Sequence, residues 1–185
     1  MTKEIVFVDT ETTGLLQPMG NDLEFQPWVF EFFGYRTTEK LKPIDEFHTL
    51  INIPVPIPDF ISRMTGICDY DLVGKPKFEK IAKQVMKIIK NANIFIAHNA
   101  TFDKGMIDIE LRRIGIDDFG FPKKTVCTVE QSLYLRGYRL KQLELYEILT
   151  GKTEIKGQHR AKKDVKALVE NYEILMIKGF KQRGI

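Results

Sequence analysis

The stretch Ile5-Val6-Phe7-Val8-Asp9-Thr10-Glu11-Thr12-Thr13-Gly14-Leu15 decides the fold of this 185-residue chain. Its first four residues are β-branched or aromatic and predict a buried strand, which we expect to end at two carboxylates and a turn. Residues two apart on a strand point to the same side, so Asp9 and Glu11 are expected to project together. Adjacent carboxylates repel each other and resist burial, and a cation between them removes that conflict. On this stretch alone, a metal site and a solvated acidic turn are equally good interpretations.

The composition is that of a globular protein, with 43% hydrophobic and 29% charged residues. Its length fits one domain, residues 1–185, with a sizeable core. No run approaches the ~20 apolar residues of a membrane span, and we expect neither a signal peptide nor a membrane partner. Cys68 and Cys127 lie far apart and match no metal-ligand spacing, so we expect reduced cysteines in a cytoplasmic protein.

The net charge of +3 is low for a nucleic-acid-binding domain. The later part of the chain is nevertheless rich in lysine and arginine. These charges form either a solvated surface or a face that attracts a polyanion, and composition does not choose between the two.

The hydrophobic pattern predicts an α/β protein in which helices flank a mixed sheet. Residues 28–35 form a second, almost wholly apolar strand whose one charge is Glu31. A lone buried acid is costly, so Glu31 is expected to face an edge or to meet a partner. Residues 36–45 are expected to form a turn, and 47–53 a third strand with His48 exposed. The remaining expected elements are strands 94–97 and 125–128, a short helix or turn over 61–67, and helices 78–91, 129–135, 140–149 and 160–177. A further helix is expected to begin within 98–103 and to stop at Gly115, and loops 15–27 and 150–158 and a frayed tail 178–185 complete the chain.

Four acids and one histidine lie at the ends of predicted elements. Asp9 and Glu11 end the first strand, Asp103 follows a later buried strand, and His159 and Asp164 begin the last helix. The carboxyl ends of strands in open α/β sheets form sites, so the acids are expected to converge. Each has a simpler interpretation, since acids favour helix N-termini and His159 could face water. Their joint occurrence favours a shared site.

Four carboxylates without cysteine form a hard oxygen ligand set, which favours Mg²⁺ or Mn²⁺. Four negative charges are too many for one divalent ion, so two ions are expected. Two such ions ~3.5–4 Å apart promote in-line displacement at phosphorus. A histidine beside them, with an ordinary pKa near ~6.5, can accept a proton from the attacking water.

Three segments together resemble the motifs of the DEDDh 3′–5′ exonucleases, most closely the epsilon-type proofreading exonuclease of bacterial DNA polymerase III. The resemblance covers about residues 4–175 and implies an RNase H-like fold. In that fold a five-stranded mixed sheet has the order 3-2-1-4-5, strand 2 is antiparallel, and helices cover both faces. The segments are Asp9 to Leu15, His98-Asn99-Ala100-Thr101-Phe102-Asp103, and His159-Arg160-Ala161-Lys162-Lys163-Asp164.

The resemblance implies a role for each of the five motif residues. Asp9, Glu11 and Asp164 would hold one ion, Asp103 would help to place a second, and His159 would be the general base. The 3′-terminal nucleotide would lie on the first motif, with the Thr13 backbone at the 3′-hydroxyl and Leu15 against the base. The implied substrate-binding residues are Thr10, Thr12, Thr13, Gly14, Leu15, His98, Asn99 and Phe102.

The sequence and the resemblance leave the substrate and the partner undecided. Single-stranded DNA 3′ ends are the expected substrate, RNA is the rival, and a DNA polymerase subunit in replication is a candidate partner. A non-catalytic binding module is less favoured because all five motif residues are present, and a phosphatase is less favoured because the spacing of Asp9 with Glu11 and of His159 with Asp164 fits it poorly. The chain departs from the family at Cys127, where aspartate is frequent, and at Lys162 and Lys163, which face either substrate phosphates or water.

Overall fold

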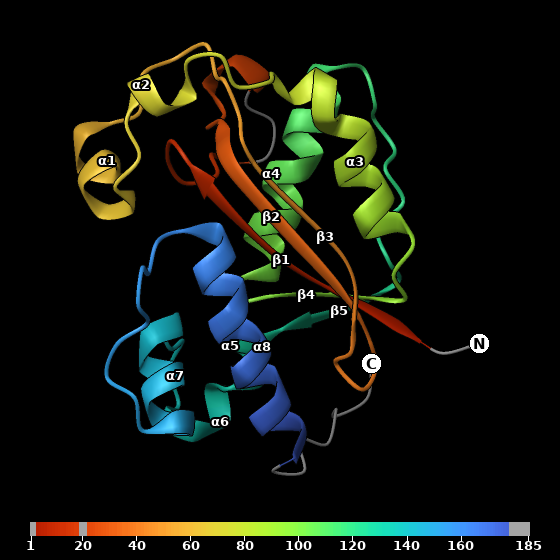
Figure 1. Cartoon of the computed structure of the whole chain (residues 1–185), viewed down its shortest axis with the longest axis vertical. Helices are drawn as coiled ribbons and strands as arrows, with labels where there is room; N and C mark the ends of the chain where they lie inside the picture. The colour runs from red at the N-terminus through yellow and green to blue at the C-terminus, as the bar shows by residue number, and fades with distance from the viewer. Residues whose placement is uncertain (1–2, 19–21, 178–185) are drawn as a thin grey trace.

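The computed structural model describes residues 3–18 and 22–177. Its centre is a five-stranded sheet in the order β3-β2-β1-β4-β5 (Figure 1). β2 is antiparallel to both β1 and β3, whereas β1, β4 and β5 run parallel. The predicted strand order and the antiparallel second strand are therefore confirmed. The strands are β1 (Glu4–Thr12), β2 (Val29–Thr38), β3 (Pro43–Leu50), β4 (Ile94–Ala97) and β5 (Lys124–Cys127).

Helices cover both faces of this sheet, as expected. None of those in the described part of the chain is long and apolar enough to cross a membrane. The predicted helices over 78–91 and 160–177 are confirmed within one residue at each end, and the tail 178–185 lies outside the described residues. The helices are η1 (Leu23–Phe25), α1 (Asp59–Thr65), α2 (Asp69–Leu72), α3 (Phe78–Lys90), α4 (Ala100–Arg113), α5 (Thr128–Gln131), α6 (Leu133–Arg136), α7 (Gln142–Thr150) and α8 (Ala161–Ile177).

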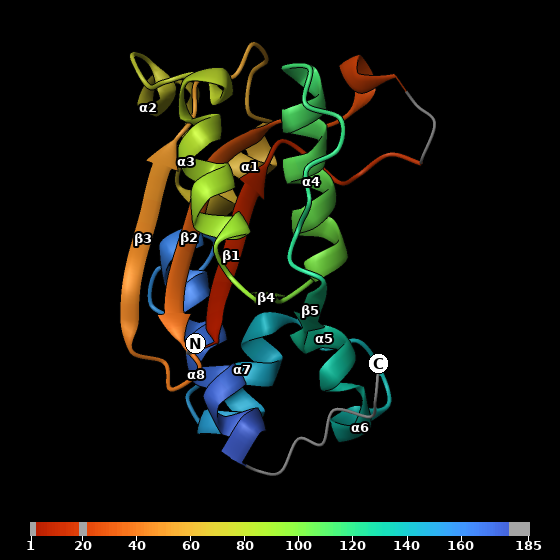
Figure 2. The same ribbon diagram turned by 90° about the vertical axis from the view of Figure 1, so that its right-hand side faces the viewer.

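The alternation of side chains along β1 assigns each residue to one face. Val6 and Val8 pack on the side covered by α3 and α4, and Ile5 and Phe7 pack against α8 on the other side. Figures 1 and 2 show these two helical layers with the sheet between them. The C-terminal end of β1 and the N-terminal end of α8 lie at the same end of the sheet (Figure 1).

Three strands differ in extent from the expectation, and β2 continues past residue 35 to Thr38. β1 does not end at its carboxylates but continues to Thr12, because β2 pairs with it as far as Val29. β3 begins at Pro43 within the expected turn and ends at Leu50, because its polar residues pair with β2 through the backbone. Pairing partners, not local hydrophobicity, set these limits.

Candidate active site

β1 carries two of the predicted acids to the face covered by α8. Ile5 and Phe7 pack against that helix, and Asp9 and Glu11 continue the same side of the strand. Asp164 lies in the first turn of α8 and meets them there. One ligand oxygen from each of the three carboxylates lies within 4.8 Å of the others. The structure therefore brings three of the four predicted acids into one group that could hold a cation.

Asp103 reaches the site from the opposite face of the sheet. It lies on α4, and its Oδ1 accepts hydrogen bonds from the Thr10 N–H (3.1 Å) and the Thr10 hydroxyl (2.9 Å). Thr10 shares the face of Val8, so Asp103 does not join the three-carboxylate group. Its charge still acts on that group, since it helps to raise the pKa of Asp9.

All four carboxyl groups have raised pKa values. Burial is the largest cause in each case, and for Asp9 and Glu11 the charges of neighbouring acids add to it. The pKa of Glu11 rises to about 8, those of Asp103 and Asp164 to about 7, and that of Asp9 well above its ordinary value. Such a cluster retains protons near neutrality until a cation displaces them. The donor set, made only of carboxylate oxygens, fits hard divalent cations such as Mg²⁺ or Mn²⁺.

His159 precedes α8 in a left-handed backbone conformation, with φ of 62°. Residues other than glycine adopt it only when their surroundings enforce it. The Asp164 carboxylate supplies part of that enforcement by accepting the N–H of Arg160 at 3.1 Å. Burial lowers the pKa of His159, so its ring is neutral at neutral pH and able to accept a proton.

The turn after β1 is held by the start of β2. The Thr12 hydroxyl donates to the Gly14 carbonyl (2.8 Å), and Thr13 N–H donates to the Trp28 carbonyl (2.9 Å). The Trp28 N–H in turn donates to the Thr13 hydroxyl oxygen at 2.9 Å. Leu15 is left 77% exposed. The backbone amide of Thr13 is thus used inside the protein, and a 3′-hydroxyl could meet its carbonyl but not its N–H.

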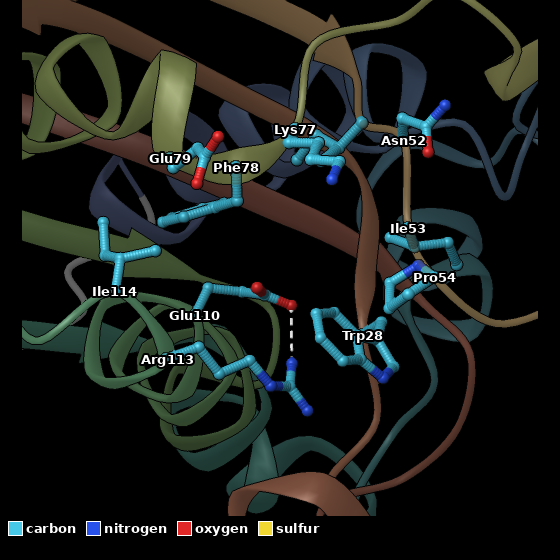
Figure 3. A pocket seen from close by; sticks show the side chains of 11 residues that line it. Trp28, Asn52, Ile53, Pro54, Lys77, Phe78, Glu79, Glu110, Arg113 and Ile114 are labelled. Atoms are coloured by element: carbon cyan, nitrogen blue, oxygen red, sulfur yellow. Dashed lines mark hydrogen bonds and ion pairs between the residues drawn. The ribbon is translucent and has the colours of Figure 1, made fainter.

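Arg113 of α4 packs against Trp28, the residue that holds the turn after β1. Its guanidinium stacks 3.6 Å from the centre of the Trp28 ring and pairs with Glu110 at 2.8 Å (Figure 3). A cavity of about 390 Å³ lies beside this stack, and no predicted site residue lines it. The Arg113 guanidinium also donates to the carbonyls of Leu23, Gln26 and Pro27.

The second motif makes contacts with the later part of the chain. The ring nitrogens of His98 lie 2.9 Å from the Thr128 hydroxyl and 3.1 Å from the Leu140 carbonyl. Burial lowers the pKa of His98 to about 4, so the ring is neutral. Both nitrogens are engaged within the protein, and any contact with substrate would involve the ring face.

Asn99 and Phe102 continue the second motif along the start of α4. Asn99 is exposed, and its Oδ1 accepts a hydrogen bond from the exposed Arg139 at 3.2 Å. Phe102 is half-buried and packs against the core on the α3–α4 side. Arg139 therefore lies at this edge of the site. Its position among the basic residues of the later chain did not indicate this contact.

Glu31 meets a partner, one of the two alternatives left open for it. It is fully buried and pairs with Arg160 of the third motif (3.1 Å) and with His48 (2.8 Å). His48 is exposed, as expected, although its Nε2 contacts the buried Glu31 carboxylate. The lone charge in an apolar strand was the signal for this contact, but it did not identify the partner.

The two lysines of the third motif differ in their surroundings. Lys162 pairs with Glu46 of β3 at 2.7 Å, and Lys163 is exposed. Cys127, the other departure from the family pattern, is buried, whereas Cys68 is exposed.

Comparison with known proteins agrees with this geometry. The exonuclease family model RNase_T matches residues 6–172. The chain is 29% identical over 187 residues to a PolC-type DNA polymerase III from Caldanaerobacter subterraneus, covering 98% of this chain but only 12% of that protein. It is also 29% identical over 180 residues to the DNA polymerase III subunit epsilon of Treponema pallidum, covering 95% of this chain and 78% of that protein.

Solved structures share the fold at lower sequence identity. The nuclease domain of 3′hExo, described as a DEDDh family member, superposes with a TM-score of 0.76 at 18% identity, covering 98% of this chain and 96% of that one. Exonuclease X gives a TM-score of 0.65 at 18% identity, covering 95% and 93%. These structures confirm the fold, and the family match together with the DNA polymerase III relatives confirms the expected resemblance to exonucleases. The chain belongs to the RNase_T exonuclease family.

Proposed function

We propose that this chain is a metal-dependent 3′–5′ exonuclease that removes nucleoside 5′-monophosphates from single-stranded DNA 3′ ends. The observation that carries the proposal is the convergence of Asp9, Glu11 and Asp164, whose ligand oxygens lie within 4.8 Å of one another. Three carboxylates so close together repel each other and favour bound cations. Asp103, which accepts hydrogen bonds from Thr10 beside this group, would help to place a second cation.

The reaction would transfer a phosphoryl group to water. Two divalent cations bound by these acids would polarise the scissile phosphate and stabilise the departing 3′-oxygen. His159 would accept a proton from the attacking water as the new P–O bond forms, which its lowered pKa permits at neutral pH. The bond between phosphorus and the 3′-oxygen of the preceding nucleotide breaks, and that oxygen takes a proton from solvent. The products are a nucleoside 5′-monophosphate and a strand shortened by one residue.

The turn after β1 would recognise the strand end without reading its sequence. Leu15, exposed and apolar, would lie against the last base, since such contacts do not distinguish bases by hydrogen bonding. The Thr13 carbonyl would accept a hydrogen bond from the 3′-hydroxyl, because the Thr13 N–H already donates to Trp28. Thr12 and Gly14 would hold the turn in this shape through their mutual hydrogen bond.

DNA is the favoured substrate because the relatives identified above by sequence comparison are DNA polymerase III proteins. Those relatives also support proofreading beside a polymerase subunit as the biological role. RNA is the second candidate, since the structure of 3′hExo has rAMP bound. Exonuclease X, by contrast, was solved with 5′-overhanging duplex DNA.

A gel assay tests the proposal directly. Single-stranded DNA and the matching RNA, each labelled at the 5′ end, are incubated with the protein and Mg²⁺, with EDTA and Asp9→Ala as controls. A descending ladder on DNA that both controls abolish is expected. A ladder chiefly on RNA would move the substrate to the second candidate. Binding without any ladder would overturn the enzymatic function and favour a non-catalytic binding module.

A further inference from the structure

Glu31 is an acid beside the site that the proposed chemistry does not use. It lies on β2 directly opposite Glu11 of β1, and its side chain is 0% exposed. Residues opposite each other in antiparallel strands have neighbouring side chains on the same face. Two carboxylates therefore face each other, which is destabilising unless one of them has other partners.

Three residues supply those partners and surround the carboxylate with donors. Arg160 approaches it side-on, with Nε 3.2 Å from Oε2 and Nη2 3.1 Å from Oε1. The Ala161 N–H donates to Oε2 at 3.1 Å, and His48 Nε2 lies 2.8 Å from Oε1. We term Glu31 with Arg160, Ala161 and His48 the Glu31 clamp. A forked, charge-assisted contact of this kind fixes orientation as well as distance.

The clamp acts on the segment that carries the third motif. Arg160 and Ala161 stand between His159, with its left-handed backbone, and Asp164 in the first turn of α8. The Arg160 N–H also donates to the Asp164 carboxylate. Arg160 therefore links the strand opposite Glu11 to an acid of the three-carboxylate group, within one residue of the proposed base.

We propose that Glu31 is a positioning residue: through Arg160 and Ala161 it fixes His159 and Asp164 relative to Glu11. This rests on the exonuclease function proposed above. Loss of the clamp therefore lowers the turnover rate far more than it lowers stability.

Two observations indicate that the Glu31 clamp contributes more to the position of the third motif than to the stability of the fold. α8 packs on the sheet through its own apolar face, which includes Val165, Leu168 and Tyr172, so the helix stays docked without the clamp. The Arg160 side chain is also 39% exposed, so water can solvate its guanidinium when Glu31 is replaced, and no buried charge is left without a partner. What the clamp adds is the placement of the first turn of α8 and the residue before it.

A second ion pair in the same region provides a matched control. Lys162 in the first turn of α8 pairs with Glu46 of β3 at 2.7 Å, and both side chains are partly exposed. This pair also links α8 to the sheet, and in the described part of the chain Glu46 forms no other hydrogen bond or ion pair with the third motif. Glu46→Gln therefore removes an ion pair between α8 and the sheet and leaves the Glu31 clamp intact.

The first test is steady-state kinetics on a 5′-labelled oligonucleotide. Glu31→Gln is expected to lower kcat by about tenfold or more, as loss of orientation does, with KM changed by less than about threefold. Arg160→Lys, which removes the fork by a different route, is expected to do the same. The double variant should be no slower than the slower single variant, because the two residues act as one unit. Glu46→Gln should keep parental kcat. Parental kcat in Glu31→Gln, or losses that multiply in the double variant, would overturn the proposal.

The second test does not depend on activity. Hydrogen exchange of the backbone across residues 156–164, measured without substrate, should be faster in Glu31→Gln and unchanged in Glu46→Gln. Unchanged exchange in Glu31→Gln overturns the clamp whatever the kinetics show. A parent protein without nuclease activity overturns the proposed function instead, and faster exchange in Glu31→Gln would still support the clamp.

Discussion

Replacing Glu11 by glutamine removes one charge from the three-carboxylate group while keeping the size of the side chain. In the folded chain the pKa of Glu11 is raised from 4.5 to about 8, by burial first and then by Asp164 and Glu31. The folded protein thus holds a proton that the unfolded chain releases near pH 4.5. The resulting destabilisation begins above that pH and is complete above pH 8. The metal-free protein is therefore expected to lose stability as the pH rises from 5 to 8.

The size of the effect follows from the shift in pKa. A rise from 4.5 to about 8 corresponds to an upper limit of about 5 kcal/mol. Because Glu11 is partly exposed and water screens its charge, we expect about 2 kcal/mol. In a chain of this length that amount raises the melting temperature by about 4–8 °C. Glu11→Gln should show this gain at pH 8 in EDTA and almost none at pH 5, where the parent carboxyl group is protonated.

Thermal unfolding of parent and variant at both pH values, in EDTA and with Mn²⁺, measures this directly. Mn²⁺ should raise the melting temperature of the parent at pH 8 and raise that of Glu11→Gln much less, since binding to the folded state stabilises it. Glu173→Gln, on the exposed face of α8, is the control and should melt as the parent does. A Glu11→Gln variant that melts at or below the parent at pH 8 in EDTA would refute the idea of a strained acidic cluster.

Three further substitutions test individual roles. Asp9→Ala should abolish turnover while the metal-free protein melts no lower than the parent, since like-charge repulsion is relieved; retained activity with a lower melting temperature would overturn its role. His159→Ala should flatten the acid limb of the kcat–pH profile, measured with saturating Mn²⁺, and the parent limb should have its midpoint below pH 6.5 because burial lowers the pKa of His159. Leu15→Ala should leave the melting temperature unchanged, because the side chain is exposed, and should raise KM for oligonucleotides by about tenfold, because most of the apolar surface that contacts the base is lost. An unchanged KM would remove Leu15 from end recognition.

The strands and the acidic group were predictable because they depend on local patterns, whereas the order of the strands was expected only from the resemblance to a known family. The apolar run before Asp9 marked β1, and its alternation placed Asp9 and Glu11 on one face. The motif order then indicated that Asp164 would join them. These inferences needed only the period of a strand and the ends of predicted elements.

The clamp and the position of Asp103 were not predictable in the same way. Glu31 and Arg160 are 129 residues apart, and only the folded chain brings α8 onto β2. The bonds from Thr10 to Asp103 likewise depend on α4 lying against the far face of β1. A single sequence shows that a buried acid needs a partner, but it does not show which partner the tertiary structure provides.

The division of β1 between two faces also limits how this enzyme can change during evolution. Val6 and Val8 fill one core while Asp9 and Glu11 occupy the other face, so an insertion or deletion within the strand would exchange the two sets. Such a change would move the acids among the apolar residues of the α3–α4 side and the valines onto the face covered by α8, so it would disturb the fold as well as the site. Selection for a stable core alone therefore also preserves the spacing of the acids, and new specificities are expected to arise by changes in the turns that flank β1 and not within it.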